Sequence, residues 1–418
     1  MRIRKAAGCL LKLPATSVAA TRTFVLREEV IGVRRDGMFA VAKDQLDPLI
    51  CELAHDGYTV IGPTIRDGAI TYDEITSAAV LPRGWTQETD GGHYRLKRRT
   101  DDACFGFVVG PHSLKRYLFP SRLKLFSVTR DGQGGFSPDV EPPPAPKYAF
   151  VGVRSCDLAA VAVQDMVFNS EMPDPYYRQV REQMFVVAVN CAEPGGTCFC
   201  SSMDTGPRCS AGYDLAITEL STSFAMEVGS ERGQAMLERV RHEEADANAR
   251  HLVDLMMSTA AKHNMGRSLD TADLPEILMS NLEHRQWDQA GNRCLACANC
   301  TLVCPTCFCN NIYDRTDLSG DHADRYRNWG SCFALEFTYH TGGYIRSSRR
   351  ARYRQWLTHK LASWHGQFGT SGCVGCGRCI TWCPVGIDIT VEATAIADDV
   401  RESLKRHGSG TKTEEADV

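Results

Sequence analysis

The sequence has no long apolar run. No stretch of its 418 residues approaches the roughly 20 consecutive apolar residues that a helix needs to cross a bilayer. The first residues, 1–25, form a lead-in that lacks the continuous apolar segment of an export signal. From these two absences we expect no membrane span and no export.

The sequence also lacks an excess of charge of one sign. It has 47 Lys and Arg against 51 Asp and Glu, a net charge of -4, so nothing predicts a surface for binding nucleic acid. The G-x-G-x-x-G fingerprint, the P-loop and the Gly-x-Ser-x-Gly elbow are missing as well. No dinucleotide, nucleoside triphosphate or acyl-transfer site is therefore indicated, and we expect no substrate chemistry performed by this chain alone.

Cysteine, by contrast, is abundant. The chain has 19 cysteines, many at short fixed spacings, within an ordinary globular composition of 43% hydrophobic residues. In a long chain without an export signal, such spacings indicate metal ligands or redox thiols far more often than disulfides. We therefore predict a cytoplasmic protein.

Hydrophobic patterning divides the chain into segments of different character, and the fold class that they predict is a multidomain α+β protein. Short apolar runs between Gly- and Pro-bearing turns indicate strands in the first half, and a longer segment without Pro indicates helix. The expected segments are a lead-in (1–25), an α/β domain (26–215), a helical connector (216–290), a ferredoxin-like domain (291–396) with an insert (305–372), and a tail (397–418).

Two cysteine runs share the pattern C-x2-C-x2-C-x3-C-P, which is typical of bacterial ferredoxins. In such runs three thiolates hold one [4Fe-4S] cluster, and the fourth, displaced by the x3 step and the proline, binds the other cluster. The predicted ligands of the first cluster are Cys294, Cys297, Cys300 and Cys383. Those of the second cluster are Cys373, Cys376, Cys379 and Cys304.

Zinc is the alternative metal for these thiolates. Zinc sites usually pair two C-x2-C knuckles, whereas here three cysteines stand at x2 steps and the pattern, proline included, occurs twice. The repeat therefore favours two clusters. Residues 347–364 of the insert have helical character, which is compatible with an all-helical ferredoxin-like module.

A second group of cysteines lies upstream. Cys156 and Cys191 each follow a run that predicts a buried strand, and a helix between them would make the two strands parallel. Because the carboxyl ends of parallel strands share one edge of a sheet, the two thiols should converge. With Cys198 and Cys200 on the following glycine-rich loop they form a candidate third [4Fe-4S] site, for which Cys209 is an alternative fourth ligand.

The remaining cysteines form no diagnostic pattern. Three of them lie in the insert, where we expect small buried apolar side chains: Cys307, Cys309 and Cys332. Cys9, Cys51 and Cys104 are isolated, and the pattern assigns them no chemistry.

Four segments resemble the family that contains the beta subunit of cytosolic NAD(P)-linked [NiFe] hydrogenases (sulfhydrogenases) and the corresponding iron–sulfur subunit of anaerobic sulfite reductase. The resemblance extends over about residues 25–396. The segments that carry it are Phe107–Pro120, Gly152–Asp157, Asn190–Cys200 and Cys294–Cys309.

The resemblance implies a non-catalytic electron-transfer subunit of a heteromeric oxidoreductase. It would carry [4Fe-4S] clusters between the small and large subunits of a [NiFe] hydrogenase on one side and a flavin-bearing, NAD(P)-binding subunit on the other. An equivalent relay to the sirohaem subunit of a sulfite reductase is the alternative. From the residues alone, a zinc-stabilised scaffold or a thiol redox sensor is a third interpretation.

Overall fold

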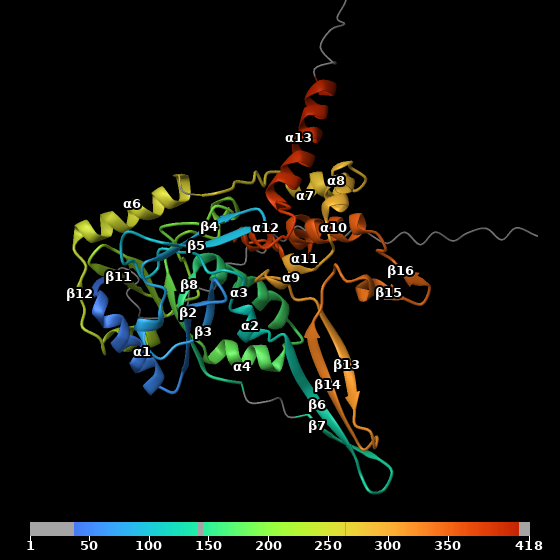
Figure 1. Cartoon of the computed structure of the whole chain (residues 1–418), viewed down its shortest axis with the longest axis horizontal. Coiled ribbons are helices and arrows are strands. Elements are labelled where there is room, and N and C mark those ends of the chain that lie inside the picture. The colour runs from blue at the N-terminus through green and yellow to red at the C-terminus, as the bar shows by residue number, and fades with distance from the viewer. Residues whose placement is uncertain (1–36, 141–144, 264, 409–418) are drawn as a thin grey trace, which may run out of the picture. The chain divides into compact units, whose positions relative to one another are not determined.

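A mixed sheet of eight strands organises the first half of the chain in the computed structural model, which describes residues 37–140, 145–263 and 265–408. The strand order is β12-β1-β11-β10-β9-β8-β2-β3 (Figure 1). The strands are β1 (Met38–Ala42), β2 (Thr59–Arg66), β3 (Ala69–Glu74), β8 (Tyr148–Arg154), β9 (Phe185–Val189), β10 (Leu215–Glu219), β11 (Ser223–Val228) and β12 (Glu243–Glu244).

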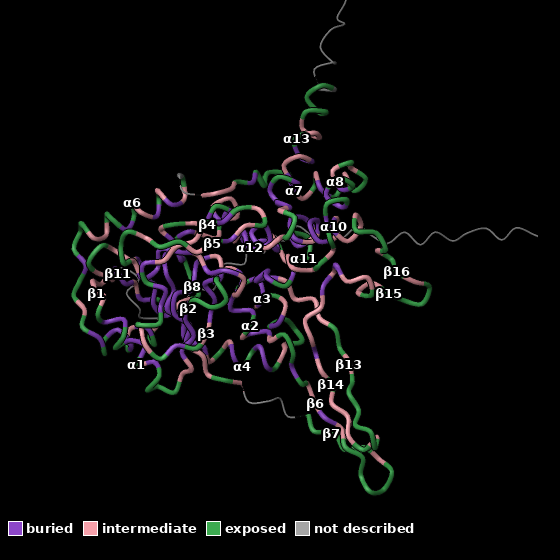
Figure 2. Tube along the Cα trace, in the orientation of Figure 1, coloured by how far each residue is buried: buried purple, intermediate pink, exposed green. Residues whose placement is uncertain are grey.

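The four central strands, β10, β9, β8 and β2, run parallel, and the flanking pairs are antiparallel. Every residue of β9 is buried, as is typical of parallel strands covered on both faces. Figure 2 shows this concentration of buried residues around β2, β8 and β11. The associated helices are α1 (Leu46–His55), α2 (Lys115–Leu118), α3 (Ser155–Phe168), α4 (Pro175–Gln183), α5 (Glu231–Leu237) and α6 (Ala247–His263).

The expected parallel β-α-β unit is present. Strand β8 leads into α3, whose chain returns through α4 to β9, and β8 pairs with β9 in parallel. The expectation for residues 216–290 is wrong in its first part, because β10 and β11 complete the sheet there and continuous helix begins only with α6. Those two strands are short and bury both faces, so they lack the alternation by which a half-buried strand is recognised.

The cysteine-rich part that follows is mainly helical around a second apolar core, which includes Trp287, Tyr353 and Trp356. Its helices are α7 (Leu274–Ser280), α8 (Gln286–Arg293), α9 (Asn299–Leu302), α10 (Arg349–Thr358), α11 (Trp364–Phe368), α12 (Arg378–Thr381) and α13 (Ile389–Gly408), with a π-helical turn (His359–Ser363) between α10 and α11. Helix α13 extends to Gly408, so the expected tail is helical over much of its length. Residues 409–418, like the lead-in and Cys9, lie outside the described residues.

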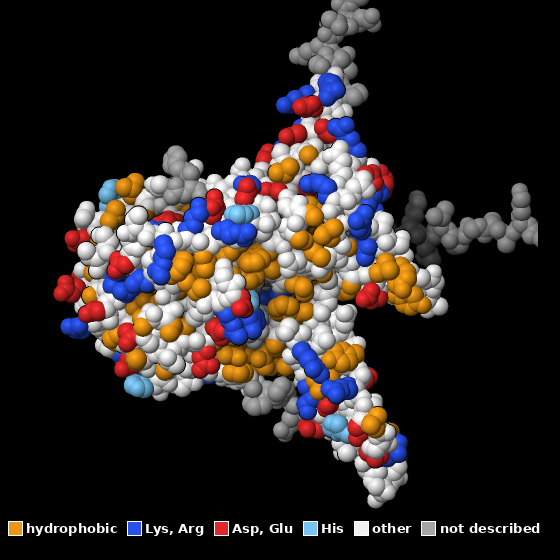
Figure 3. Space-filling model, in the orientation of Figure 1, with side chains coloured by type: hydrophobic (Ala, Val, Ile, Leu, Met, Phe, Trp, Pro, Cys, Tyr) orange, Lys and Arg blue, Asp and Glu red, His pale blue; other side chains and the backbone are white. Residues whose placement is uncertain are grey.

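The insert contains β-structure as well as the expected helix. Strands β13 (Asn310–Thr316) and β14 (His322–Trp329) form a hairpin that pairs with β6 (Arg122–Arg130), which in turn pairs with β7 (Phe136–Asp139). An all-helical module is therefore ruled out. We call these four strands the arm; Figure 3 shows both signs of charge mixed along it. Two smaller hairpins are β4–β5 (Trp85–Asp90, His93–Arg98) and β15–β16 (Tyr339–His340, Gly343–Tyr344).

No helix among the described residues combines the length and apolar character needed to cross a membrane. The described residues all belong to one compact unit. Its two halves are held together by buried polar contacts: the Gln164 amide donates to the Pro305 carbonyl oxygen at 2.8 Å, and the Lys115 ammonium donates to the carbonyl oxygens of Thr301 and Leu302.

Candidate iron–sulfur centres

The two cysteine runs have the same backbone conformation. In the first run Ala296 and Ala298 have positive φ angles of 53° and 66°, and in the second run Gly375 and Gly377 at the matching positions have φ angles of 62° and 72°. Left-handed backbone is unfavourable for alanine, so the first run adopts it at a cost of about 1–2 kcal/mol per residue. The repeat in the sequence is thus a repeat in three dimensions.

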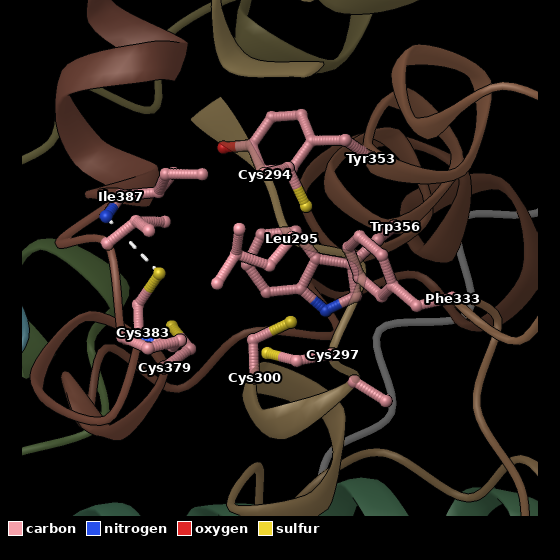
Figure 4. Close-up of a pocket in the computed structure, with 13 residues that line it drawn as sticks. Cys294, Leu295, Cys297, Cys300, Phe333, Tyr353, Trp356, Cys379, Cys383 and Ile387 are labelled. Carbon is pink, nitrogen blue, oxygen red and sulfur yellow. Dashed lines mark hydrogen bonds between the residues drawn. The ribbon is translucent and has the colours of Figure 1, made fainter. Parts of the chain in front are cut away.

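The first site gathers the thiols that the sequence assigned to it. Cys294, Cys297, Cys300 and Cys383 line one hollow, and Figure 4 shows their sulfurs facing it. Counting the part open to solvent, about 410 Å³ of this hollow is free of atoms. The run from 294 to 300 and the last cysteine of the other run therefore meet, as crossed ligation requires.

Backbone N–H groups point at the sulfurs of the first site. Ala296 donates to Cys294 Sγ and Ile387 donates to Cys383 Sγ, each at 3.3 Å (Figure 4). Such N–H groups stabilise thiolate sulfur and tune the potential of a bound cluster. The aromatic rings of Phe333, Tyr353 and Trp356 form much of the wall.

The second site is formed by Cys304 and the thiols of the second run. Cys373, Cys376 and Cys304 all lie close enough to Cys379 to raise its thiol pKa electrostatically, in addition to the larger effect of burial. All four side chains are at least partly buried. The structure thus places the second predicted set together.

A buried ammonium group serves the second site. Lys360, in the π-helical turn, donates to Cys304 Sγ at 3.1 Å, to Thr306 Oγ1 at 3.0 Å and to the Gly372 carbonyl oxygen at 3.2 Å. The pKa of Cys304 is lowered well below its usual value by a hydrogen bond from Cys307 and by the charge of Lys360, against the opposing effect of burial. This sulfur is therefore held as a thiolate.

The third candidate set also converges. Cys156 lies in the first turn of α3, and Cys191 follows β9 at the same edge of the sheet. Together with Cys198 and Cys200 they line a hollow of about 400 Å³, nearly the size of that at the first site. Cys209 is absent from the wall of this hollow: it is buried in the core of the sheet, and its backbone N–H donates to Asn190 Oδ1 at 2.7 Å.

The three sites lie in a row. Cys376, from the second set, also lines the hollow of the third site, and Cys379, from the same set, also lines that of the first. In addition, Cys198 Sγ lies 3.8 Å from the Cys376 carbonyl oxygen. The second site therefore stands between the other two.

The loop of the third site interlocks with the second cysteine run. The Phe199 N–H donates to the Gly375 carbonyl oxygen at 2.8 Å, and the hydroxyls of Thr197 and Thr381 are 2.7 Å apart. A Cβ atom at Gly375 would lie 2.5 Å from the Phe199 oxygen, and one at Gly377 would lie 2.3 Å from the Thr197 oxygen. Glycine is therefore required in the second run, where the first run has alanine.

A buried ion pair joins the same two sites. The Arg378 guanidinium contacts the Asp157 carboxylate at 2.8 and 3.0 Å, and both side chains are almost completely buried. Arg378 also donates to the Gly110 carbonyl oxygen at 3.1 Å. The pair stands beside Cys156 and Cys376, so it contributes fixed charge next to both thiol sets.

Residues 293–387 match the family profile of the 4Fe-4S dicluster domain. The chain is 31% identical over 262 residues to sulfhydrogenase 2 subunit beta of Pyrococcus furiosus, an alignment that covers 62% of this chain and 75% of the relative. This chain belongs to the family of sulfhydrogenase beta subunits. No solved structure matches this beta-subunit homologue. Membership implies an iron–sulfur subunit that transfers electrons in a multisubunit hydrogenase-type complex.

Three charged residues of this beta-subunit homologue had no signal of their own in the sequence. Lys360 is 56 positions from the cysteine that it contacts, and Arg378 and Asp157 are 221 positions apart. The only hint was adjacency, since Asp157 follows Cys156 and Arg378 stands between two cysteines of the second run. Their partners become evident only in three dimensions.

The cysteines left outside the three sets differ in exposure. Cys104 is buried and Cys51 is exposed. Cys307, Cys309 and Cys332 are partly exposed, so the expectation of small, fully buried side chains is wrong for these three. They lie where the insert leaves and rejoins the cysteine module, a place that its hairpin creates.

Replacing Gly377 by Ala should disrupt the second and third sites together, because the new Cβ would collide with the Thr197 oxygen. We expect Gly377→Ala to lose iron and to lower the free energy of unfolding by more than the roughly 1–2 kcal/mol that a left-handed alanine costs elsewhere. The matched control is Ala298→Gly, which should keep its iron and change stability by less than about 1 kcal/mol. Iron assay and anaerobic denaturant unfolding measure both; equal effects at the two positions would contradict the interlock.

Removing the Lys360 charge should lower a reduction potential. A hydrogen bond to a charged group is worth about 1.5–3 kcal/mol, which for one electron corresponds to about 60–130 mV. Lys360→Met should therefore shift one potential downward by an amount of this order, since the reduced, more negative centre loses a positive donor. A redox titration followed by electron paramagnetic resonance measures the shift. The exposed Lys405→Met is the control, and an unchanged potential in Lys360→Met would refute the role of Lys360.

Proposed function

We propose that this chain carries three [4Fe-4S] clusters and relays electrons between a [NiFe] hydrogenase module and a flavin-bearing, NAD(P)-binding subunit. The observation that carries the proposal is the row of three four-thiol sites, in which Cys376 and Cys379 of the middle site also form walls of the outer two. Thiols shared between neighbouring walls place adjacent sites in direct contact. A row of this kind suits a relay better than three isolated structural centres.

The donor sets fit iron–sulfur clusters. Soft thiolate sulfur is the usual ligand of such clusters, and each site offers four cysteines. A bound cluster supplies reversible one-electron transfer. The protein contributes the N–H donors at Cys294 and Cys383, the ammonium at Cys304 and apolar walls that limit access of water.

Zinc fits these sets less well. Four thiolates around one zinc ion lie about 2.3 Å from the metal, so their sulfurs would be only about 3.8 Å apart. Within the part of the chain that the structure describes, no three His, Cys, Asp or Glu side chains converge this tightly on a point. The thiols instead surround hollows, a spacing that favours a larger inorganic core over a single ion.

The third site carries the least support from motifs and the most from geometry. Its four cysteines come from separate segments of the sheet domain, yet they face one hollow whose wall includes Cys376 of the dicluster part. Burial raises the pKa of the Cys198 and Cys191 thiols. Buried neutral thiols without a partner would gain little from such convergence, whereas deprotonation on metal binding gives them one.

The hydrogenase assignment rests on the relative's name, sulfhydrogenase 2 subunit beta. By that likeness, we propose that the partners are the small and large hydrogenase subunits together with a flavin and NAD(P)-binding subunit, and that the complex is cytoplasmic. The flow of electrons would enter at one end of the row and leave at the other. A sirohaem subunit is the alternative partner, and the composition of the complex decides between them.

Anaerobically purified protein should contain about twelve irons and twelve acid-labile sulfides per chain, the sum for three cubanes. Cys297→Ser, Cys376→Ser and Cys198→Ser should each lose about four irons, because each removes one ligand of a different site. Cys51→Ser, an exposed thiol outside the three sets, is the control and should lose none. Eight irons that persist in Cys198→Ser would remove the third cluster from the proposal if the wild type also holds eight.

Crossed ligation has its own test in the spectra of the variants. Cys383→Ser should perturb the same electron paramagnetic resonance signal as Cys297→Ser, although Cys383 belongs to the second run. Cys304→Ser should perturb the signal that Cys376→Ser perturbs. If Cys383→Ser instead alters the signal of the second run, each run would hold its own cluster.

The complex isolated through a tag on this chain should contain nickel, together with a flavin-bearing subunit that oxidises NADH or NADPH. Metal analysis, flavin fluorescence and the visible spectrum of the complex measure this. Sirohaem without nickel would replace the hydrogenase with a sulfite reductase and leave the relay intact. A chain isolated without iron, and without either partner, would contradict the relay itself.

A further inference from the structure

Two cysteines outside the three sites meet at the base of the arm. Cys309 directly precedes β13 and Cys332 lies shortly after the end of β14, and the last pair of this antiparallel hairpin is Asn310 with Trp329. Beyond that pair the Gly330 N–H donates to the Cys309 carbonyl oxygen at 2.8 Å. The hairpin register thus brings the two cysteines together.

Their sulfurs interact directly. Cys309 Sγ accepts hydrogen bonds from the thiol and from the backbone N–H of Cys332. The hydrogen bond from Cys332, together with the backbone donors and the nearby charge of Lys115, lowers the pKa of Cys309 to about 7 against the opposing effect of burial. The same contact raises the pKa of Cys332. One sulfur is therefore poised as a nucleophile and the other as its proton donor.

The surroundings supply fixed positive charge without a competing carboxylate among the causes of these shifts. Lys115 is buried, with its ammonium held by the Thr301 and Leu302 carbonyl oxygens and 4.1 Å from the centre of the Trp329 ring. It lies close enough to Cys309 to favour the thiolate. A low-pKa thiol beside a cation is the environment of reactive cysteines.

The pair stands apart from the thiol sets of the proposed clusters. Cys307, the third cysteine of this region, is engaged with Cys304 of the second site, so it does not complete a ring with the other two. Two sulfurs in mutual contact, each partly exposed, match a dithiol rather than a four-ligand metal site. We propose that Cys309 and Cys332 form a dithiol–disulfide pair that exchanges with low-molecular-weight disulfides and, when oxidised, clamps the base of the β13–β14 hairpin.

The reaction is thiol–disulfide exchange. The Cys309 thiolate attacks one sulfur of a small disulfide RSSR, which breaks the S–S bond and releases RS⁻ that takes up a proton. Cys332 then loses its proton and attacks the Cys309 sulfur of the mixed disulfide, and the second RS⁻ leaves and is protonated. The two protein thiols are oxidised by two electrons, and RSSR is reduced to two RSH.

The clamp would act next to the first site. Cys332 lies close enough to Cys300 for the two sulfurs to interact electrostatically, and Ser331 Oγ is 2.8 Å from Thr301 Oγ1. A disulfide that closes the loop 309–332 would remove freedom from the hairpin where it joins this site. The state of the pair would thus report the thiol redox balance of the surroundings to the cluster end of the arm.

The test uses the holoprotein, prepared anaerobically and equilibrated with glutathione buffers of increasing disulfide content. After acid quench and alkylation, peptide mass spectrometry should find the peptides of Cys309 and Cys332 joined, with the loss of two hydrogens, and dithiothreitol should reverse the link. The iron content should stay unchanged throughout. Cys332→Ser should instead trap glutathione on Cys309, and Cys307→Ser should leave the link intact.

Three results would overturn the proposal. The first is alkylation of both cysteines in the most oxidising buffer as completely as in the reducing one. The second is a link from either of them to Cys304 or Cys307. The third is loss of about four irons in Cys309→Ser or Cys332→Ser, which would make these residues cluster ligands. The wild-type peptide map decides the question even if a variant fails to fold, and none of these results bears on the iron count of the three relay sites.

Discussion

The exchange of one thiol between two distant cysteine runs is the constraint on which the rest of the structure depends. Cys383 completes the first site and Cys304 the second, although 68 residues, 305–372, separate the runs. Because each site needs a sulfur from the other run, neither can form alone, and the insert must leave and return at nearly the same place. The arm, the π-helical turn and the Cys309–Cys332 pair are built on this return.

The same constraint explains why the sheet domain and the cysteine module are packed so closely. The loop that carries Cys198 and Cys200 lies on the second run with no space for side chains at Gly375 and Gly377. Close backbone approach of this kind fixes the distance between the second and third sites more firmly than side-chain packing could. The buried charges follow the same plan: Lys360 compensates thiolate at Cys304, and Arg378 is neutralised by Asp157.

Much of the site could be predicted from sequence because its signals are local. The spacing within each run fixes three thiols, and the parallel β8–α3–β9 unit brings Cys156 and Cys191 to one edge of the sheet. The membership in the sulfhydrogenase beta family agrees with the resemblance carried by these motifs. What sequence reasoning missed is non-local: the strands β10 and β11 belong to a sheet formed with distant segments, and Lys360 and Arg378 contact their partners through the fold. The hairpin of the insert was missed because its strands are largely exposed and polar, so no apolar alternation marks them.

The central claim is that a middle site couples two outer ones. The most direct test is electron paramagnetic resonance of the fully reduced protein, compared with its Cys376→Ser variant. The wild-type spectrum should integrate to about three spins per chain and show broadening from mutual interaction. Loss of the middle cluster should leave two signals sharpened into independent spectra. Outer signals that remain coupled without the middle cluster, or three signals that never interact in the wild type, would contradict the row.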